Sequence, residues 1–189
     1  MSYLFQCYAK VYDRFMDKFH LDDDTIILDM IGKGNKKIAD IGGGTGRTAD
    51  KLIKMGHFVT IIDPCRSMTR RAKKRNQMIQ IINQTMPYDI KDEYDVILFR
   101  DCLHHIKKQR ETLKLCSNKL KKDGFIIIAD FSPESIKSKL IFLFERLCFE
   151  RIWEVEEKKL LKLLESLNMN TKLIQVNDRD YIVIGRKNK

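Results

Sequence analysis

A glycine-rich turn between an expected strand and an expected helix constrains this chain more than any other feature. Residues 38–41 read Ile-Ala-Asp-Ile, a short apolar run typical of a buried strand, and the chain continues Gly-Gly-Gly-Thr-Gly-Arg to position 47. Glycine allows a ligand to approach the backbone closely, and the free N–H groups at a helix start attract a negative group. The segment therefore predicts a nucleotide-type binding turn.

The spacing of the glycines separates three kinds of nucleotide site. A dinucleotide site requires Gly-x-Gly-x-x-Gly/Ala, but the last position is occupied by Arg47. A phosphate-binding P-loop requires a glycine where this chain has Ile41, and a lysine where it has Arg47. The pattern that remains is acidic-x-Gly-x-Gly-x-Gly, formed by Asp40, Gly42, Gly44 and Gly46.

Short apolar runs alternate with amphipathic segments along most of the chain. Strands are expected at 38–41, 58–62, 79–82, 96–99 and 125–129, and helices at 3–31, 47–55, 66–77 and 107–120. Apolar residues at helical spacing follow at 160–167, and two final runs, 172–176 and 181–185, predict a hairpin. Alternating strands and helices predict an α/β fold with a doubly wound, mostly parallel sheet.

The glycine motif resembles the first motif of the class I S-adenosylmethionine-dependent methyltransferases. A second match follows, because Phe58-Val59-Thr60-Ile61-Ile62-Asp63 places an acid at the end of the second strand. In that family this acid binds the two ribose hydroxyls, and a carboxylate can accept two hydrogen bonds. Residues 64–68, Pro-Cys-Arg-Ser-Met, are similar to the family's turn beside the adenine.

Further matches occur in the order that the family has them. Pro87 and residues 93–100 resemble the region of the fourth strand, and residues 101–106, Asp-Cys-Leu-His-His-Ile, resemble the following loop of quinone-biosynthesis-type methyltransferases. Residues 120–130 resemble the turn into the fifth strand, and Tyr12-Asp13 is similar to an N-terminal pair in that subfamily. The resemblance covers about residues 8–130.

The resemblance implies a Rossmann-like methyltransferase fold of seven strands, with S-adenosylmethionine as cofactor and S-adenosylhomocysteine as product. One position departs from the pattern: after the third strand the family offers an acid to the adenine amino group, where this chain has Asn83. Its amide oxygen could accept the same hydrogen bond. The expected cofactor-binding residues are Asp40, Gly42, Gly43, Gly44, Gly46, Asp63, Pro64, Met68, Asn83 and Arg100.

The sequence offers fewer candidate residues for binding the methyl acceptor than for binding the cofactor. His104 and His105 follow the fourth strand at the edge where such sheets bind ligands, and histidine titrates near neutral pH, so both are candidate bases. Tyr12, with Tyr8, is a candidate for closing the site. The alternative is that the two histidines face solvent. The five cysteines form no Cys-x-x-Cys pair, and we expect no metal site.

The chain is expected to form a single domain over 1–189, with four parts. These are an N-terminal helical cap at 1–34, a cofactor-binding core at 35–130, a helical acceptor-side segment at 131–168 and a C-terminal β-hairpin at 169–189. The segment around 136–149 is apolar on all sides. It therefore predicts a mobile cap, formed by residues 3–20 and 131–150, with completion of the core as the alternative.

The predicted function is methyl transfer to a small-molecule acceptor with an apolar or aromatic body. An RNA methyltransferase ranks second, because the net charge is +10. Against it, most basic residues are dispersed, and neither an Asn/Asp-Pro-Pro-Tyr/Phe motif nor a Pro-Cys motif is found. A non-catalytic cofactor-binding regulatory subunit ranks third.

The expected location is cytoplasmic. The N-terminus has no basic region followed by an apolar stretch, and no apolar run approaches the roughly 20 residues that span a bilayer. The oligomeric state is not predicted.

Overall fold

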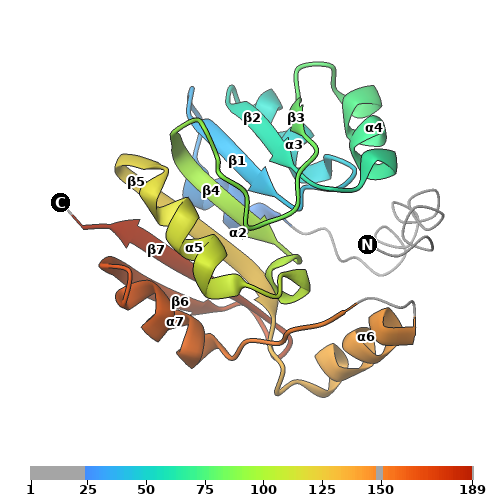
Figure 1. Cartoon of the computed structure of the whole chain (residues 1–189), viewed down its shortest axis with the longest axis vertical. Helices are drawn as coiled ribbons and strands as arrows, with labels where there is room; N and C mark the ends of the chain where they lie inside the picture. Colours follow the sequence, from blue (N-terminus) through green and yellow to red (C-terminus); the bar gives the residue numbers. More distant parts are fainter. Residues whose placement is uncertain (1–23, 148–150, 189) are drawn as a thin grey trace.

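The chain builds one sheet of seven strands in the order β3-β2-β1-β4-β5-β7-β6 (Figure 1). This computed structural model describes residues 24–147 and 151–188. The strands are β1 (Lys37–Ile41), β2 (Phe58–Ile62), β3 (Gln80–Ile82), β4 (Tyr94–Arg100), β5 (Leu120–Phe131), β6 (Met169–Gln175) and β7 (Asp180–Lys187). The helices are α2 (Thr25–Ile31), α3 (Arg47–Lys54), α4 (Arg66–Arg75), η1 (Leu103–His105), α5 (Gln109–Asn118), α6 (Ile136–Leu147) and α7 (Glu157–Glu165).

The pairing of the strands confirms the predicted fold class. Strands β1 to β5 pair in parallel, whereas β7 runs antiparallel to both β5 and β6. The order reverses between β1 and β4, because the chain first extends the sheet through β2 and β3 and then returns to the other side of β1. The final pair is the predicted hairpin, joined through residues 176–179.

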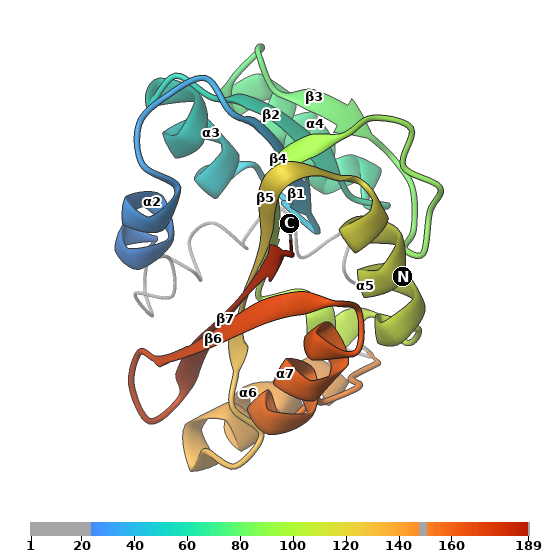
Figure 2. The same cartoon turned by 90° about the vertical axis from the view of Figure 1, so that its left-hand side faces the viewer.

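Helices cover both faces of the sheet, as Figure 2 shows for α2 and α3 on one side and α5 and α7 on the other. The side chains of β1 alternate between these faces. Ile38 packs in the cluster with α2, α3 and α4, and Ile41 packs in the cluster with α5 and α7. A strand buried on both faces is continuously apolar, which explains why the central strands could be recognised from the sequence.

One boundary differs clearly from the sequence prediction. The helix expected at 107–120 is the shorter α5, and β5 begins at Leu120 rather than at 125. Leu120 pairs with Tyr94 before an irregularity in the register, and Asp123 adopts a positive φ of 63° there. Asp tolerates this conformation better than most residues, so the chain pairs early and then bends where a turn was expected.

The N-terminal and acceptor-side segments are only partly described. Of the helices expected at 3–31, α2 is described and ends at Gly32 as predicted, while residues 3–20, with Tyr8 and Tyr12, lie outside the described residues. In α6, Phe142 is buried, but four apolar side chains are exposed: Ile136, Leu140, Leu143 and Leu147. The sequence predicts that both sides of this segment are buried, but among the described residues only the side that carries Phe142 is buried.

None of the helices in residues 24–147 and 151–188 has the length and apolar character needed to cross a membrane.

The packing of α7 on the hairpin gives a direct test of the fold. Leu164 is fully buried, and a Cβ at Gly185 of β7 would lie 3.2 Å from its Cδ1 atom. Leu164→Ala should lower the free energy of unfolding by about 2–5 kcal/mol, because the tight packing leaves a cavity. Leu173→Ala on the exposed side of β6 should cost under about 1 kcal/mol. Urea unfolding of both variants checks this, and equal losses would contradict the packing described.

Candidate functional site

The predicted site residues, apart from Tyr12 outside the described residues, gather near the carboxyl ends of β1, β2, β3 and β4. The reversal of strand order between β1 and β4 opens a crevice at this edge, which is where doubly wound sheets bind ligands. A small cavity of about 40 Å³ lies here. It is lined by Asp40, Gly42, Gly43, Gly44, Thr45, Arg47, Thr48 and Arg100.

Each glycine of the turn is required at its position for its own physical reason. Gly42, Gly44 and Gly46 have positive φ angles of 70°, 54° and 75°. A Cβ at Gly46 would lie 2.7 Å from the Cβ of Ala72, so this glycine lets α3 approach α4. A Cβ at Gly44 would meet only the carbonyl oxygen of Gly42, at 3.8 Å, so the backbone of Gly44 borders open space.

A buried charge cluster lies beneath the turn. Arg100 Nε is 2.6 Å from Asp24 Oδ1, and Lys51 Nζ is 2.8 Å from Asp24 Oδ2. Asp40 Oδ2 is buried without a hydrogen-bond partner among the described residues. Burial, together with the charge of Asp24, raises the pKa of Asp40 to about 7, although Arg100 opposes the rise. A cation bound in the adjoining small cavity would therefore stabilise the ionised form of Asp40.

Asp63 and Asn83 occupy adjoining positions at the ends of β2 and β3. Asp63 accepts hydrogen bonds from the backbone N–H of Gly44 at 3.1 Å and of Cys65 at 2.7 Å. Burial raises the pKa of Asp63, and these two hydrogen bonds oppose the rise. Asn83 Nδ2 donates to the carbonyl oxygen of Asp63 and to Thr69 Oγ1, both at 2.9 Å. Because a carbonyl only accepts, this contact fixes the amide and leaves the Asn83 oxygen for an outside donor.

The two remaining residues predicted beside the adenine differ in exposure. Met68 lies on α4 and is almost fully buried, at 1% exposure, whereas Pro64 is half-buried. Neither lines the small cavity. Their contact with a cofactor stays a prediction.

The loop after β4 brings both histidines to the same edge. Cys102 Sγ donates to the carbonyl oxygen of Ile41 at 2.9 Å, which ties this loop to the glycine-rich turn. His104 Nδ1 lies 2.5 Å from Asp130 Oδ1, at the end of β5. Phe142 of α6 contacts the edge of the His104 ring, with ring centroids 5.4 Å apart. His104 is therefore held in place on two sides.

Glu145 of α6 completes a cluster with the two histidines. Its carboxylate lies 3.6 Å from His104 Nε2 and 3.7 Å from His105 Nε2. Burial alone would lower the pKa of His104, but Asp130 and Glu145 raise it to about 10. Burial and the neighbouring charge of His104 lower the pKa of His105 to about 4. The carboxylates around His104 therefore favour its protonated form, whereas the surroundings of His105 favour its neutral form.

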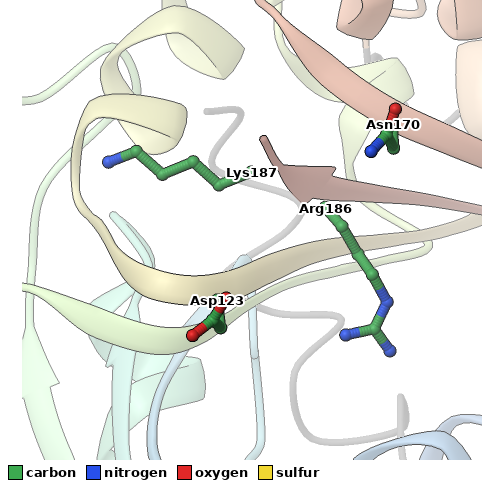
Figure 3. A pocket seen from close by; sticks show the side chains of 4 residues that line it. All are labelled: Asp123, Asn170, Arg186 and Lys187. Carbon is green, nitrogen blue, oxygen red and sulfur yellow. The ribbon is translucent and has the colours of Figure 1, made fainter. Parts of the chain in front are cut away.

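A second hollow lies at the opposite edge of the sheet, between the start of β5 and the end of β7 (Figure 3). It is lined by Asp123, Asn170, Arg186 and Lys187. None of these residues belongs to the predicted site, and the guanidinium of Arg186 packs over the ring of Phe125 instead. The candidate site therefore lies at the edge of the sheet with the glycine-rich turn, and not at this second hollow.

A model of a methyltransferase domain matches residues 10–176 of the chain, which include the turn, Asp63 and the histidine loop. The chain belongs to this methyltransferase family.

Relatives and solved structures agree with this assignment. The chain is 23% identical over 199 residues to an uncharacterised methyltransferase of Oceanobacillus iheyensis, covering 95% of this chain and 87% of the relative. Its fold matches a SAM-dependent methyltransferase of Thermotoga maritima with a TM-score of 0.78 at 18% identity, covering 98% of both chains. It also matches the 1,6-didemethyltoxoflavin-N1-methyltransferase of Burkholderia thailandensis, with bound 1,6-didemethyltoxoflavin and S-adenosylhomocysteine. There the TM-score is 0.70 at 18% identity, covering 98% of this chain and 88% of the other.

These findings confirm the recognition made from the sequence. The chain is a class I S-adenosylmethionine-dependent methyltransferase with a Rossmann-like sheet. The roles assigned to single residues of this methyltransferase stay predictions.

Sequence reasoning missed three residues of the candidate site. Asp24 lies under the turn from the start of α2, and nothing in its run of acids marks it. Asp130 is the penultimate residue of β5 and Asp63 directly follows β2, and this shared position of an acid at the carboxyl end of a strand was a usable signal. Glu145 and its neighbour Arg146 are the two charged residues in the apolar run 140–149, which also could have identified Glu145.

The contact between Gly42 and Cys102 makes a sharp test of the methyltransferase site. A Cβ at Gly42 would lie 2.6 Å from the Cβ of Cys102, so Gly42→Ala should separate the two loops. We expect S-adenosylmethionine affinity to fall at least about tenfold. Gly32→Ala is the matched control, because its φ is 69° and a Cβ there meets nothing within 4 Å. Calorimetric titration of both folded variants checks this. Equal affinities would show that the contact does not shape the site.

Proposed function

We propose that this methyltransferase transfers a methyl group from S-adenosylmethionine to a small-molecule acceptor with an apolar or aromatic body. The observation that carries the proposal is the apolar surround of the histidine loop. The ring of Phe131, at the end of β5, lies 5.8 Å from the ring of His104, and the ring of Phe142 of α6 lies 5.4 Å from it. Both phenylalanines are buried, so the histidine loop has an apolar surround, which favours an acceptor with an apolar or aromatic body over a polynucleotide.

The residues at the glycine-rich turn fit the cofactor in chemical terms. The open backbone at Gly44, the carboxylate of Asp63 and the free oxygen of Asn83 lie along one edge, matching an adenosine with its diol and amino group. The unpartnered, buried oxygen of Asp40 suits the cationic end of the methionine part. When bound, the cofactor supplies an activated methyl group on a sulfonium, which needs alignment more than acid–base help.

On the acceptor side, the chain's own contribution is to orient the acceptor and exclude water. His104 is fixed by Asp130, and the neighbouring Trp153 N–H donates to the His104 carbonyl at 2.7 Å. His105, about one quarter exposed, is the acceptor-side histidine that an acceptor hydroxyl can reach. We retain both histidines as acceptor-side residues, and Tyr12 as a proposal that rests on the sequence alone.

RNA is the second candidate acceptor, because helix α4 is rich in arginine and lysine. Its basic side chains are largely exposed, as an RNA surface would require. However, Lys73 Nζ donates to the carbonyls of Gln77 and Ile79, and Arg75 Nε donates to the carbonyl of Thr45. Part of this charge therefore stabilises the methyltransferase itself, and RNA stays behind the small molecule. A regulatory subunit without turnover ranks third.

A cytoplasmic location and the four-part division of the chain also stay proposals from the sequence.

Cofactor affinity should depend on pH through Asp40. The pKa of Asp40 is raised to about 7, chiefly by burial, and only the ionised carboxylate attracts a cation. Binding therefore favours the deprotonated form, and affinity should fall about tenfold from pH 7.5 to pH 6, with proton release on binding. Calorimetry in two buffers of different ionisation enthalpy measures this. Asp40→Asn is the control, since the ligand's own amino group titrates equally with both proteins. A pH profile that the substitution leaves unchanged would remove Asp40 from the ammonium site.

The acceptor class is tested by release of S-adenosylhomocysteine, followed by mass spectrometry. We expect release with aromatic acceptors that carry a hydroxyl or amino group, and none with structured RNA. Gly42→Ala serves as the inactive control. Release with RNA alone would instead support the RNA methyltransferase. Tight cofactor binding without release from any acceptor would support the regulatory subunit.

A further inference from the structure

Three side chains with metal-binding atoms meet beside the proposed acceptor site. One ligand atom from each of His104, His105 and Glu145 lies within 4.8 Å of the others. The carboxylate of Glu145 is 3.6 Å from His104 Nε2 and 3.7 Å from His105 Nε2. These separations are too long for good hydrogen bonds, but they approach the spacing of ligands that share one ion at about 2 Å.

Buried polar atoms in this cluster lack ordinary partners. Neither His104 Nε2 nor Glu145 Oε2 has a hydrogen bond among the described residues, although both atoms are buried. His104 Nε2 and Glu145 Oε2 face each other as an ion pair at 3.6 Å without a hydrogen bond. Because buried nitrogen and oxygen atoms are almost always hydrogen-bonded, this gap points to a group held between them. The His104 side chain is only 2% exposed, so bulk water does not supply the missing partner.

The surroundings of His104 match those of a metal-binding histidine. Its Nδ1 atom bonds Asp130 Oδ1, and the other carboxylate oxygen of Asp130 accepts from the His104 backbone N–H at 3.3 Å. A carboxylate on one ring nitrogen orients the other nitrogen toward an ion, and this pairing recurs behind ligating histidines. Asp130 itself is held, since its Oδ1 also accepts from the Phe131 N–H at 2.9 Å.

The cluster is closed on one side and open on the other. Phe131 and Phe142 cover His104, whereas the side chains of His105 and Glu145 are 26% and 23% exposed. Three protein ligands with an open direction are typical of an ion that also binds water or a substrate. The charges also balance once His104 releases its proton to solvent, because a dication then offsets the carboxylates of Asp130 and Glu145.

We propose that His104, His105 and Glu145 bind one first-row transition-metal dication, for which Zn²⁺ is the probe, with Asp130 positioning His104. Two imidazole nitrogens and one carboxylate suit Zn²⁺ and its neighbours, whereas Mg²⁺ and Ca²⁺ prefer oxygen ligands. The inference departs from the sequence prediction of no metal site. Its link to function rests on the proposed small-molecule activity: the open position takes a hydroxyl or carboxylate oxygen of the acceptor.

The test is metal binding by the full chain, after removal of metal with a chelator and without cofactor or acceptor. Calorimetry with Zn²⁺ should show one ion bound per chain. His105→Ala and Glu145→Gln should each weaken Zn²⁺ binding at least about tenfold, and Asp130→Asn about 10–100-fold. Glu134→Gln, an exposed acid before α6, is the matched control and should bind as the parent does.

A second measurement separates this site from adventitious binding by the cysteines. Co²⁺ in place of Zn²⁺ should give a visible spectrum of nitrogen and oxygen ligands, without the near-ultraviolet charge-transfer band of thiolate. No saturable binding, or binding that neither His105→Ala nor Glu145→Gln alters, would overturn the proposal. S-adenosylmethionine affinity measured on the same variants should not change. Zn²⁺ binding that persists while no small acceptor turns over would count against the proposed function and leave the metal site standing.

Discussion

The contact of Gly42 with Cys102 is the constraint on which the rest of the site depends. The two loops follow adjacent parallel strands, and Cys102 fills the volume that any larger residue at position 42 would occupy. The thiol also bonds the carbonyl of Ile41, and burial raises the pKa of the thiol far enough to keep it neutral. Because this contact holds the cofactor-side turn against the histidine loop, the two halves of a methyl-transfer site can keep a fixed separation.

Buried charge is concentrated at this one edge, on both sides of that contact. Asp24, Arg100 and Asp40 lie on the cofactor side, and Asp130, His104 and Glu145 lie on the acceptor side. Each group includes a carboxylate with a buried oxygen that makes no hydrogen bond among the described residues, Asp40 in the first and Glu145 in the second. Burying such groups costs free energy unless a partner is bound. The methyltransferase thus has buried carboxylate oxygens without hydrogen bonds at the edge where its ligands are proposed to bind.

Sequence reasoning succeeded where a local pattern had one physical solution. The run from Ile38 to Gly46 could only be a buried strand that enters a turn with positive φ angles, and the structure has both. It failed at 120–125, since pairing of Leu120 with Tyr94 decides that β5 starts early. It also missed Asp130 and Glu145, because their importance comes from meeting His104 across 26 and 41 residues of chain.

The sequence by itself determined the fold class, the family and the cofactor-side turn of this protein. Backbone requirements such as those of Gly42 and Gly44, and the alternation of buried strands, act over a few residues and can be recognised locally. Only the tertiary structure decided the acceptor side. There the charge state of His104, the orientation of Asn83 and the grouping with Glu145 depend on burial and on distances between elements remote in sequence. Desolvation and charge interactions are set by three-dimensional position, which no short pattern of residues encodes.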